Sequence, residues 1–290
     1  MAPLTAGAIL DRRFRLTVPL GGPAAASGTG TVWAATELRT GAEVAVKVLA
    51  PHLAGDMVAE ASFRLAVRTI TQLTSPEVTR ILDYGEITEP GGFAVPYVVR
   101  ELADGRSVAD LLGDGPLPVE EALRVTATAA DALAVAHPAG LVHGRIQPGN
   151  VIVGPDRVRI TDFGLGSLGP GPAGRVLSYQ APELADGGAA TPAADVYAVG
   201  VLFAACLAGA HRPASAATRD IPASLAGLWA ACLAISPRDR PGAAHVAVLV
   251  RQALADIVGP RLTGTGPMAA MAASSRPAPR PAVPAARWPG

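Results

Sequence analysis

The sequence predicts an α+β protein of two lobes, in which a small strand-rich N-terminal part precedes a larger helical part. Two observations lead to this prediction. Between residues 14 and 49, apolar residues alternate with polar ones around clusters of glycine, which is typical of strands. After Gly105 the pattern changes to one of helices and loops, which continues to about Val258.

The N-terminal part combines strands with one helix. The turn at residues 39–41 contains Gly41 and is expected to join two strands as a hairpin. Apolar residues recur at helical spacing from Met57 to Leu73, and Ser75-Pro76 ends that helix. The expected strands cover residues 14–18, 31–35, 43–49, 79–84 and 94–100.

The C-terminal part is mainly helical, and a tail of different composition follows it. Residues 263–290 contain three arginines, six prolines and no acidic residue, which is typical of a disordered tail. We therefore expect an N-lobe at 11–103, a C-lobe at 104–262 and a tail at 263–290. The expected C-lobe elements are helices at 108–112 and 118–136, a loop at 143–150, and a short hairpin of strands at 151–153 and 158–160.

Composition excludes several classes of protein. The chain of 290 residues has 24 basic and 24 acidic side chains, so its neutral balance argues against a protein that coats nucleic acid or an anionic membrane. Two cysteines, Cys206 and Cys232, are too few for a disulfide framework. The longest apolar stretch, residues 196–210, is too short to span a membrane, and no secretory signal is visible. We expect a cytoplasmic protein with no membrane span.

Two residue types occur once each. Lys47 is the only lysine, against 23 arginines, and Asn150 is the only asparagine. Abundant alanine, glycine and proline indicate a GC-rich coding background, in which lysine and asparagine become rare everywhere. The two positions that retain them are therefore candidates for a specific chemical requirement.

Short motifs at fixed spacing surround both residues. They are Val-Ala-Val-Lys at 44–47, a loop from His143 to Asn150, Asp-Phe-Gly at 162–164 and Ala-Pro-Glu at 181–183. In this order and at these separations they resemble the signature motifs of protein kinases, most closely the actinobacterial type of Ser/Thr kinase. The resemblance covers roughly residues 11–258. Segments 195–200 and 238–241 also resemble a central C-lobe helix and a late Arg-Pro motif of that family.

The resemblance implies a two-lobed kinase-like fold that binds ATP with Mg²⁺. Lys47 would contact the α- and β-phosphates, and Asp162 and Asn150 would supply oxygen ligands to the metal ion. Gly28 and Gly30 would retain part of the phosphate cradle. Val32, Ala45 and Ile152 would lie above and below the adenine ring, and Glu101 and Leu102 are further expected nucleotide-binding residues.

Two further contacts implied by the family are architectural. Glu183 and Arg240 would form the buried ion pair that anchors the activation segment. His143 would pack against Phe163 and serve neither as an acid nor as a base.

The catalytic loop departs from the family pattern His-Arg-Asp-Leu-Lys-Pro-x-Asn. Gly144, Arg145 and Gln147 occupy the Arg, Asp and Lys positions. The Asp accepts the proton of the substrate hydroxyl, whereas an arginine does not deprotonate in proteins. Loss of a general base alone lowers the rate by about 10² to 10⁴.

Other departures lie around the phosphate site. In the family a glutamate pairs with the lysine that corresponds to Lys47, and Ala66 occupies the position of that glutamate. Without it, Lys47 could pair with Asp162 instead and close the phosphate site. Glu60 could replace the glutamate only if the helix shifts. Arg100 stands at the gatekeeper position, normally apolar, where it could pair with Asp162 or Glu60 or point outward.

The loops on either side of the site are altered too. The segment 20–32 is longer than the family's phosphate loop, and Pro23 removes one N–H that could face a phosphate. Val176 replaces the threonine that precedes Ala-Pro-Glu in the family and that is phosphorylated there. The family's arginine that pairs with this phosphate is also missing, because position 144 is glycine.

Three hypotheses follow. The sequence favours a pseudokinase that binds ATP and Mg²⁺ but transfers phosphate poorly, and that acts as a scaffold or allosteric regulator in signalling. The alternatives are an active Ser/Thr kinase with a non-standard mechanism and a structural interaction domain that binds no nucleotide. The expected partners are proteins, among them an active kinase or a phosphothreonine-binding domain that would use the tail residues Thr263, Thr265, Ser274 and Ser275.

Overall fold

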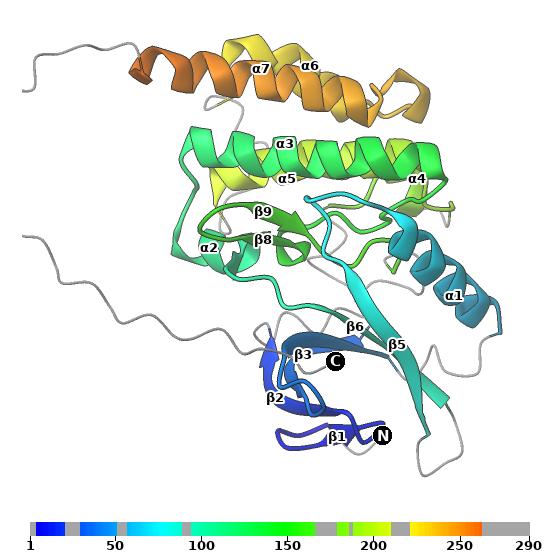
Figure 1. Cartoon of the computed structure of the whole chain (residues 1–290). Helices are drawn as coiled ribbons and strands as arrows, with labels where there is room; N and C mark the ends of the chain where they lie inside the picture. The colour runs from blue at the N-terminus through cyan, green and yellow to red at the C-terminus, as the bar shows by residue number, and fades with distance from the viewer. Residues whose placement is uncertain are drawn as a thin grey trace, which may run out of the picture.

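The computed structural model describes residues 4–20, 30–50, 57–88, 94–165, 179–185, 188–209 and 221–262. It has the predicted α+β architecture, with a curled antiparallel sheet and one helix in the N-lobe and a bundle of helices in the C-lobe (Figure 1). Gly28, Val176 and the tail at 263–290 lie outside the described residues, as do the side chains of residues 57–60.

The N-lobe is built on a six-stranded antiparallel sheet in the order β1-β2-β3-β4-β6-β5. The hairpin predicted at 39–41 is confirmed, because β3 and β4 pair on either side of it and Gly41 has a φ of 74°. Helix α1 (Met57–Gln72) packs beside β5 (Figure 1). The strands are β1 (Ile9–Leu10), β2 (Phe14–Leu20), β3 (Gly30–Glu37), β4 (Glu43–Leu49), β5 (Ile81–Thr88) and β6 (Ala94–Glu101).

The C-lobe core lies between long apolar helices, with α6 and α7 above α3 and α5 (Figure 1). Small buried alanines on α3 allow close packing against α5 and α7. The long helices are α3 (Val119–Ala136), α5 (Pro192–Ala208) and α7 (Ala243–Leu262), and the shorter ones are α2 (Val108–Asp114), α4 (Pro182–Ala185) and α6 (Ala226–Cys232). The short strands β7 (Arg106–Ser107), β8 (Val151–Val153) and β9 (Val158–Ile160) form a second sheet. The 3₁₀ turns are His137–Ala139, Pro148–Asn150, Ala223–Leu225 and Pro237–Asp239.

Helix α5 is more apolar than the other long helices α3 and α7, and it is buried. Thr191 caps its N-terminus, with the hydroxyl accepting the N–H of Ala194 at 3.2 Å, and Pro192 fits the first turn. Cys206 on this helix and Cys232 on α6 are both buried as free thiols. In the part of the chain that the structure describes, no helix is both long and apolar enough to cross a membrane.

The largest difference between a predicted and an observed strand start is at β5. The strand expected from Thr79 begins at Ile81, because Val78 forms a bridge with Ile160 of β9 and the N–H of Thr79 donates to the Ile160 carbonyl at 3.0 Å. The residues just before β5 therefore pair with the C-lobe. Strands β1 and β7, two residues each, are too short for a periodic pattern to predict them.

The predicted ion pair of Glu183 and Arg240 is confirmed. Two guanidinium nitrogens of Arg240 donate to the two carboxylate oxygens of Glu183 at 2.6 and 2.7 Å. The Arg240 side chain is fully buried, and it also donates to the carbonyls of Ala193, Ala234 and Ile235. The hydrogen bonds from Arg240 lower the pKa of Glu183 below its ordinary value. One side chain thus ties the segment before α5 to the turn before α7.

Replacing Arg240 with Met is expected to destabilise the domain by at least about 3 kcal/mol, because it leaves buried acceptors without donors. Urea unfolding measures this change. The control is Arg251→Met, which removes a more exposed ion pair with Asp131 and is expected to cost less than about 1 kcal/mol. Equal effects of the two substitutions would contradict the role given to Arg240.

Candidate functional site

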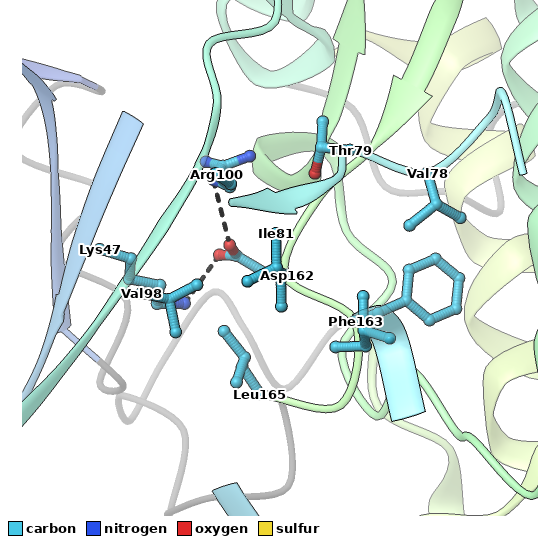
Figure 2. A pocket seen from close by; sticks show the side chains of 10 residues that line it. Lys47, Val78, Thr79, Ile81, Val98, Arg100, Asp162, Phe163 and Leu165 are labelled. Atoms are coloured by element: carbon cyan, nitrogen blue, oxygen red, sulfur yellow. Dashed lines mark hydrogen bonds and ion pairs between the residues drawn. The ribbon is translucent and has the colours of Figure 1, made fainter. Parts of the chain in front are cut away.

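A buried ion pair between Lys47 and Asp162 lies where the two lobes meet. Lys47 is on β4 of the N-lobe, and Asp162 follows β9 of the C-lobe. The ammonium nitrogen of Lys47 donates to Oδ2 of Asp162 at 2.7 Å, and the two side chains are only 3% and 8% exposed (Figure 2). Lys47 therefore contacts Asp162, the alternative partner that the sequence analysis named in the absence of a glutamate at position 66.

Arg100 extends this pair into a cluster. It is on β6, directly opposite Ala45 of β4, and its side chain is 11% exposed. Among the three directions that the sequence left open, its guanidinium points toward Asp162, with Nε 3.8 Å from Oδ1 (Figure 2). That separation is too long for a hydrogen bond, so both atoms are buried without a hydrogen-bond partner among the described residues.

The cluster keeps its carboxylate ionised. Burial alone would raise the pKa of Asp162, but the charges of Lys47 and Arg100 outweigh this effect and hold the pKa at about 2. Burial lowers the pKa of Lys47 below its ordinary value despite the support of Asp162, and Arg100 and Arg145 lower it further. The single carboxylate is thus shared among several cations.

The loop that carries Arg145 is fixed by buried hydrogen bonds. Oδ1 and Oδ2 of Asp195 on α5 accept the N–H groups of Gly144 and His143 at 2.9 and 2.8 Å. His143 is fully buried, and its ring lies 4.6 Å from that of Phe163, as the family resemblance predicted. Its Nδ1 accepts the N–H of Arg145 and its Nε2 lies 3.0 Å from the Thr161 carbonyl, which is the pattern of a neutral imidazole. Burial lowers the pKa of His143 accordingly.

Gly144 has a φ of 75°, in the left-handed region that glycine enters without strain. The glycine that replaces the family's arginine therefore suits the backbone at this point. It also leaves no side chain there to pair with a phosphate.

Arg145 is the member of the cluster that belongs to the loop at 143–150. Its side chain is half-buried, and its Nη1 has no hydrogen-bond partner among the described residues. Burial lowers the pKa of Arg145, while the charge of Asp162 supports the guanidinium. Its backbone carbonyl accepts the side-chain N–H of Asn150 at 2.9 Å. The position expected to hold a catalytic base thus presents a cation that interacts with Asp162.

Ala66 serves packing on the face of α1 that meets the 162–164 segment. It is buried, and a Cβ built on Gly164 would lie 2.8 Å from the Cβ of Ala66. Gly164 itself has a φ of 68°. The two small residues allow α1 to approach this segment closely, and the space that a glutamate would need is filled.

The residues expected around the adenine are distributed over both lobes. Ala45 is buried on β4, whereas Val32 on β3 and Ile152 on β8 are half-buried. Leu102 is also half-buried and follows the end of β6. Val32, Ala45 and Leu102 thus belong to the N-lobe side of the expected adenine site, and Ile152 belongs to the second sheet.

The side chain of Glu101 is used for a structural purpose. Its carboxylate pairs with Arg159 of β9 and accepts the backbone N–H of Arg80 at 3.0 Å. With its carboxylate engaged in this way, the groups of Glu101 that remain for hydrogen bonds to a nucleotide are those of its backbone. The contact with Arg159, which the sequence did not suggest, joins β6 to the C-lobe.

Gly30 and Gln147, two other residues that the sequence analysis singled out, show no feature specific to phosphate binding. Gly30 begins β3, and a Cβ there would lie 2.1 Å from the carbonyl oxygen of Val48, so the sheet alone requires glycine. Gln147 is half-buried and precedes the 3₁₀ turn of the loop. Neither observation assigns a contact with phosphate.

A small cavity lies behind the ion cluster. It has a volume of about 10 Å³, which is room for roughly one water molecule. Lys47, Arg100 and Asp162 line one part of it, and the rest is mainly apolar (Figure 2). Arg100 is the site residue whose role the sequence did not settle. The available signal was a charged residue near the end of a strand, at a position that is normally apolar in the family.

Replacing Asp162 with Asn is expected to lower the free energy of unfolding by about 3–5 kcal/mol at pH 7, because Lys47 and Arg100 lose their counter-charge. The pKa of Asp162 is lower in the folded state, so its stabilising effect is complete above the ordinary pKa of 3.8 and is lost as pH falls toward about 2. The difference in the free energy of unfolding between wild type and Asp162→Asn should therefore be constant from pH 7 to 4 and become smaller below pH 4.

Urea unfolding at a series of pH values measures this difference. The control is Asp114→Asn, which removes an exposed carboxylate paired with Arg106 and should have little effect at any pH. A difference that narrows already between pH 7 and 5 would contradict the low pKa of Asp162.

Comparison with known proteins identifies the family of this chain. The protein kinase domain family matches residues 26–248. Serine/threonine-protein kinase PknA of Mycobacterium tuberculosis is 38% identical over 205 residues, covering 68% of this chain and 47% of PknA. PknL of the same organism is 33% identical over 215 residues, covering 71% and 51%. The chain thus spans about half the length of these curated relatives.

A solved structure shows the same fold. The crystal structure of the Mycobacterium tuberculosis PknI kinase domain superimposes with a TM-score of 0.68 at 27% identity, covering 86% of this chain and 99% of that one. The match to the family extends from the phosphate loop to α7 and includes every motif of the cluster. The chain belongs to the protein kinase domain family.

Proposed function

We propose that this protein kinase domain binds an adenine nucleotide, transfers phosphate poorly, and acts as a scaffold or allosteric regulator in signalling. The observation that carries the proposal is Arg145, which stands where the resemblance places the family's catalytic base. A guanidinium stays protonated in proteins and accepts no proton from a substrate hydroxyl. The retained Lys47, Asn150 and Asp162 support binding of a nucleotide.

Phosphate groups suit the cluster that surrounds Asp162. Lys47 and Arg100 are cations on the N-lobe, and Arg145 is a partly exposed cation on the C-lobe. Nη1 of Arg145 and Nε of Arg100 lack acceptors among the described residues, and a phosphate oxygen is an acceptor for both kinds of N–H. The adenine would lie against Val32, Ala45, Leu102 and Ile152.

The metal ion expected from the family fits less well. Asp162 and Asn150 are the residues that would ligate Mg²⁺, which prefers carboxylate and carbonyl oxygens. In this arrangement Lys47 occupies Oδ2 of Asp162 and the guanidinium of Arg100 faces Oδ1. The family uses ATP with Mg²⁺, but these donors do not present an open metal site, and no step of the proposed function depends on the metal ion.

An active kinase with a non-standard mechanism is the second candidate. Its support is the similarity to PknA and PknL, both named serine/threonine-protein kinases. A domain that binds no nucleotide is the third, and its support is the direct pairing of Lys47 with Asp162. Protein partners, among them an active kinase or a phosphothreonine-binding domain acting on the tail, belong to the proposal in all three cases.

Phosphate transfer distinguishes the first two candidates. With radiolabelled ATP and generic protein substrates, we expect wild type to transfer phosphate at a rate about 10² to 10⁴ below that of the PknA kinase domain, because the base is absent. The measurement is incorporation of label, with Asp162→Ala and a mock preparation as blanks. The proposal fails if label transfer is strong, is lost in Asp162→Ala and is absent from the mock preparation.

A further inference from the structure

We propose that the nucleotide site of this domain binds a nucleoside triphosphate without a divalent metal ion, with Arg100 and Arg145 supplying the positive charge that faces the phosphates. The inference rests on the proposed function, since it concerns the same nucleotide. It goes beyond that function by defining the ligand as metal-free ATP and by assigning two binding residues.

The charge of the cluster is the first argument. Lys47, Arg100 and Arg145 carry three positive charges, and Asp162 carries the single negative charge that they share. The cluster therefore has a net charge of +2. Like charges in a poorly solvated site repel strongly, and the side chains of Lys47 and Arg100 are only 3% and 11% exposed. An anion relieves this repulsion, whereas Mg²⁺ would increase it.

The unpaired polar atoms are the second argument. Nε of Arg100 and Nη1 of Arg145 are buried N–H donors without acceptors among the described residues. A buried donor without an acceptor carries a free-energy penalty, and a phosphate oxygen removes it by forming a charge-assisted hydrogen bond. A metal ion accepts no hydrogen bond, so it would leave the N–H groups of Arg100 and Arg145 without acceptors.

Displacement of existing contacts is the third argument. Mg²⁺ takes six oxygen ligands at near-ideal geometry and usually binds through one or two carboxylates together with the substrate phosphates. At Asp162 it would have to separate the 2.7 Å pair with Lys47 and approach the guanidinium of Arg100. Both cations would then remain buried beside the metal. A triphosphate can contact the same cations while they keep their carboxylate.

The surroundings indicate from which side the ligand enters. The cavity behind Lys47, Arg100 and Asp162 holds about one water molecule and is otherwise mainly apolar, so it cannot take a phosphate. Arg145 does not line this cavity and belongs to the loop at 143–150. The phosphates would therefore lie outside the cavity, on the side of that loop.

Calorimetric titration of the full chain with ATP, in EDTA and in excess Mg²⁺, tests the inference. We expect the dissociation constant in EDTA to be equal to that in Mg²⁺ within threefold. In EDTA, AMP should bind at least tenfold more weakly than ATP, since it offers fewer charges to the cluster. Binding that is tenfold or more tighter with Mg²⁺, or equal binding of AMP and ATP, would overturn the inference. Absence of ATP binding in both buffers would instead overturn the proposed function.

Two variants test the assigned residues. Arg100→Met should weaken the binding of ATP in EDTA at least tenfold and make it responsive to Mg²⁺, because Oδ1 of Asp162 loses its cation. Asp162→Asn should retain or strengthen the binding of ATP in EDTA, because it removes the anion that competes with phosphate. If Asp162 instead holds a metal ion, the Asn variant will bind ATP much more weakly than wild type in excess Mg²⁺, and the inference fails.

The matched control is Arg124→Met. Arg124 forms an exposed ion pair with Glu120 on α3, so its loss should leave the affinity for ATP unchanged. Circular dichroism establishes that each variant is folded before titration. Should the Asn variant not fold, the wild-type titrations and Arg100→Met decide the question. An unchanged affinity in folded Arg100→Met would contradict the role of that residue.

Discussion

The carboxylate of Asp162 connects the two lobes, and the arrangement of the site depends on it. The residue belongs to the C-lobe, but its ionic partners Lys47 and Arg100 are on two neighbouring strands of the N-lobe sheet. It has a φ of 66°, a conformation that an aspartate tolerates better than most residues. Separating the lobes would expose the pair to water or leave charges without partners. The relative position of the lobes and the protonation of the site are therefore coupled.

Other contacts between the lobes support this position from outside the cluster. The carboxylate of Glu101 joins β6 to Arg159 of β9, and the bridge from Val78 to Ile160 attaches the segment before β5 to the same strand. Strand β9 leads directly into Asp162. The N-lobe is therefore attached both to Asp162 and to the strand that precedes it. A scaffold or allosteric regulator needs coupling of this kind between a ligand site and the arrangement of its lobes.

The sequence predicted the architecture and the local elements well, because strand alternation, helical spacing and motif order are local properties. It also predicted the pairs Glu183–Arg240 and His143–Phe163, through resemblance to the family. The direction of Arg100 remained open because a long side chain at a strand end can reach several partners. The use of Glu101 as a link to Arg159 depends on residues 58 positions apart, which only tertiary structure brings together. The packing of Ala66 on Gly164 was invisible for the same reason.

The departures from the family pattern change the charge of the site in one direction. With a glutamate at position 66, an aspartate at 145, a lysine at 147 and an apolar residue at 100, the same positions with Lys47 and Asp162 would have a net charge of −1, which favours a divalent cation. The actual residues Ala66, Arg100, Arg145 and Gln147 make it +2. Arg145 removes the proton acceptor, and together with Arg100 it supplies the positive charge that a metal ion would otherwise bring. A site that keeps Asp162 but has a cation in place of the base and another at position 100 is better suited, as proposed above, to holding a triphosphate than to cleaving it.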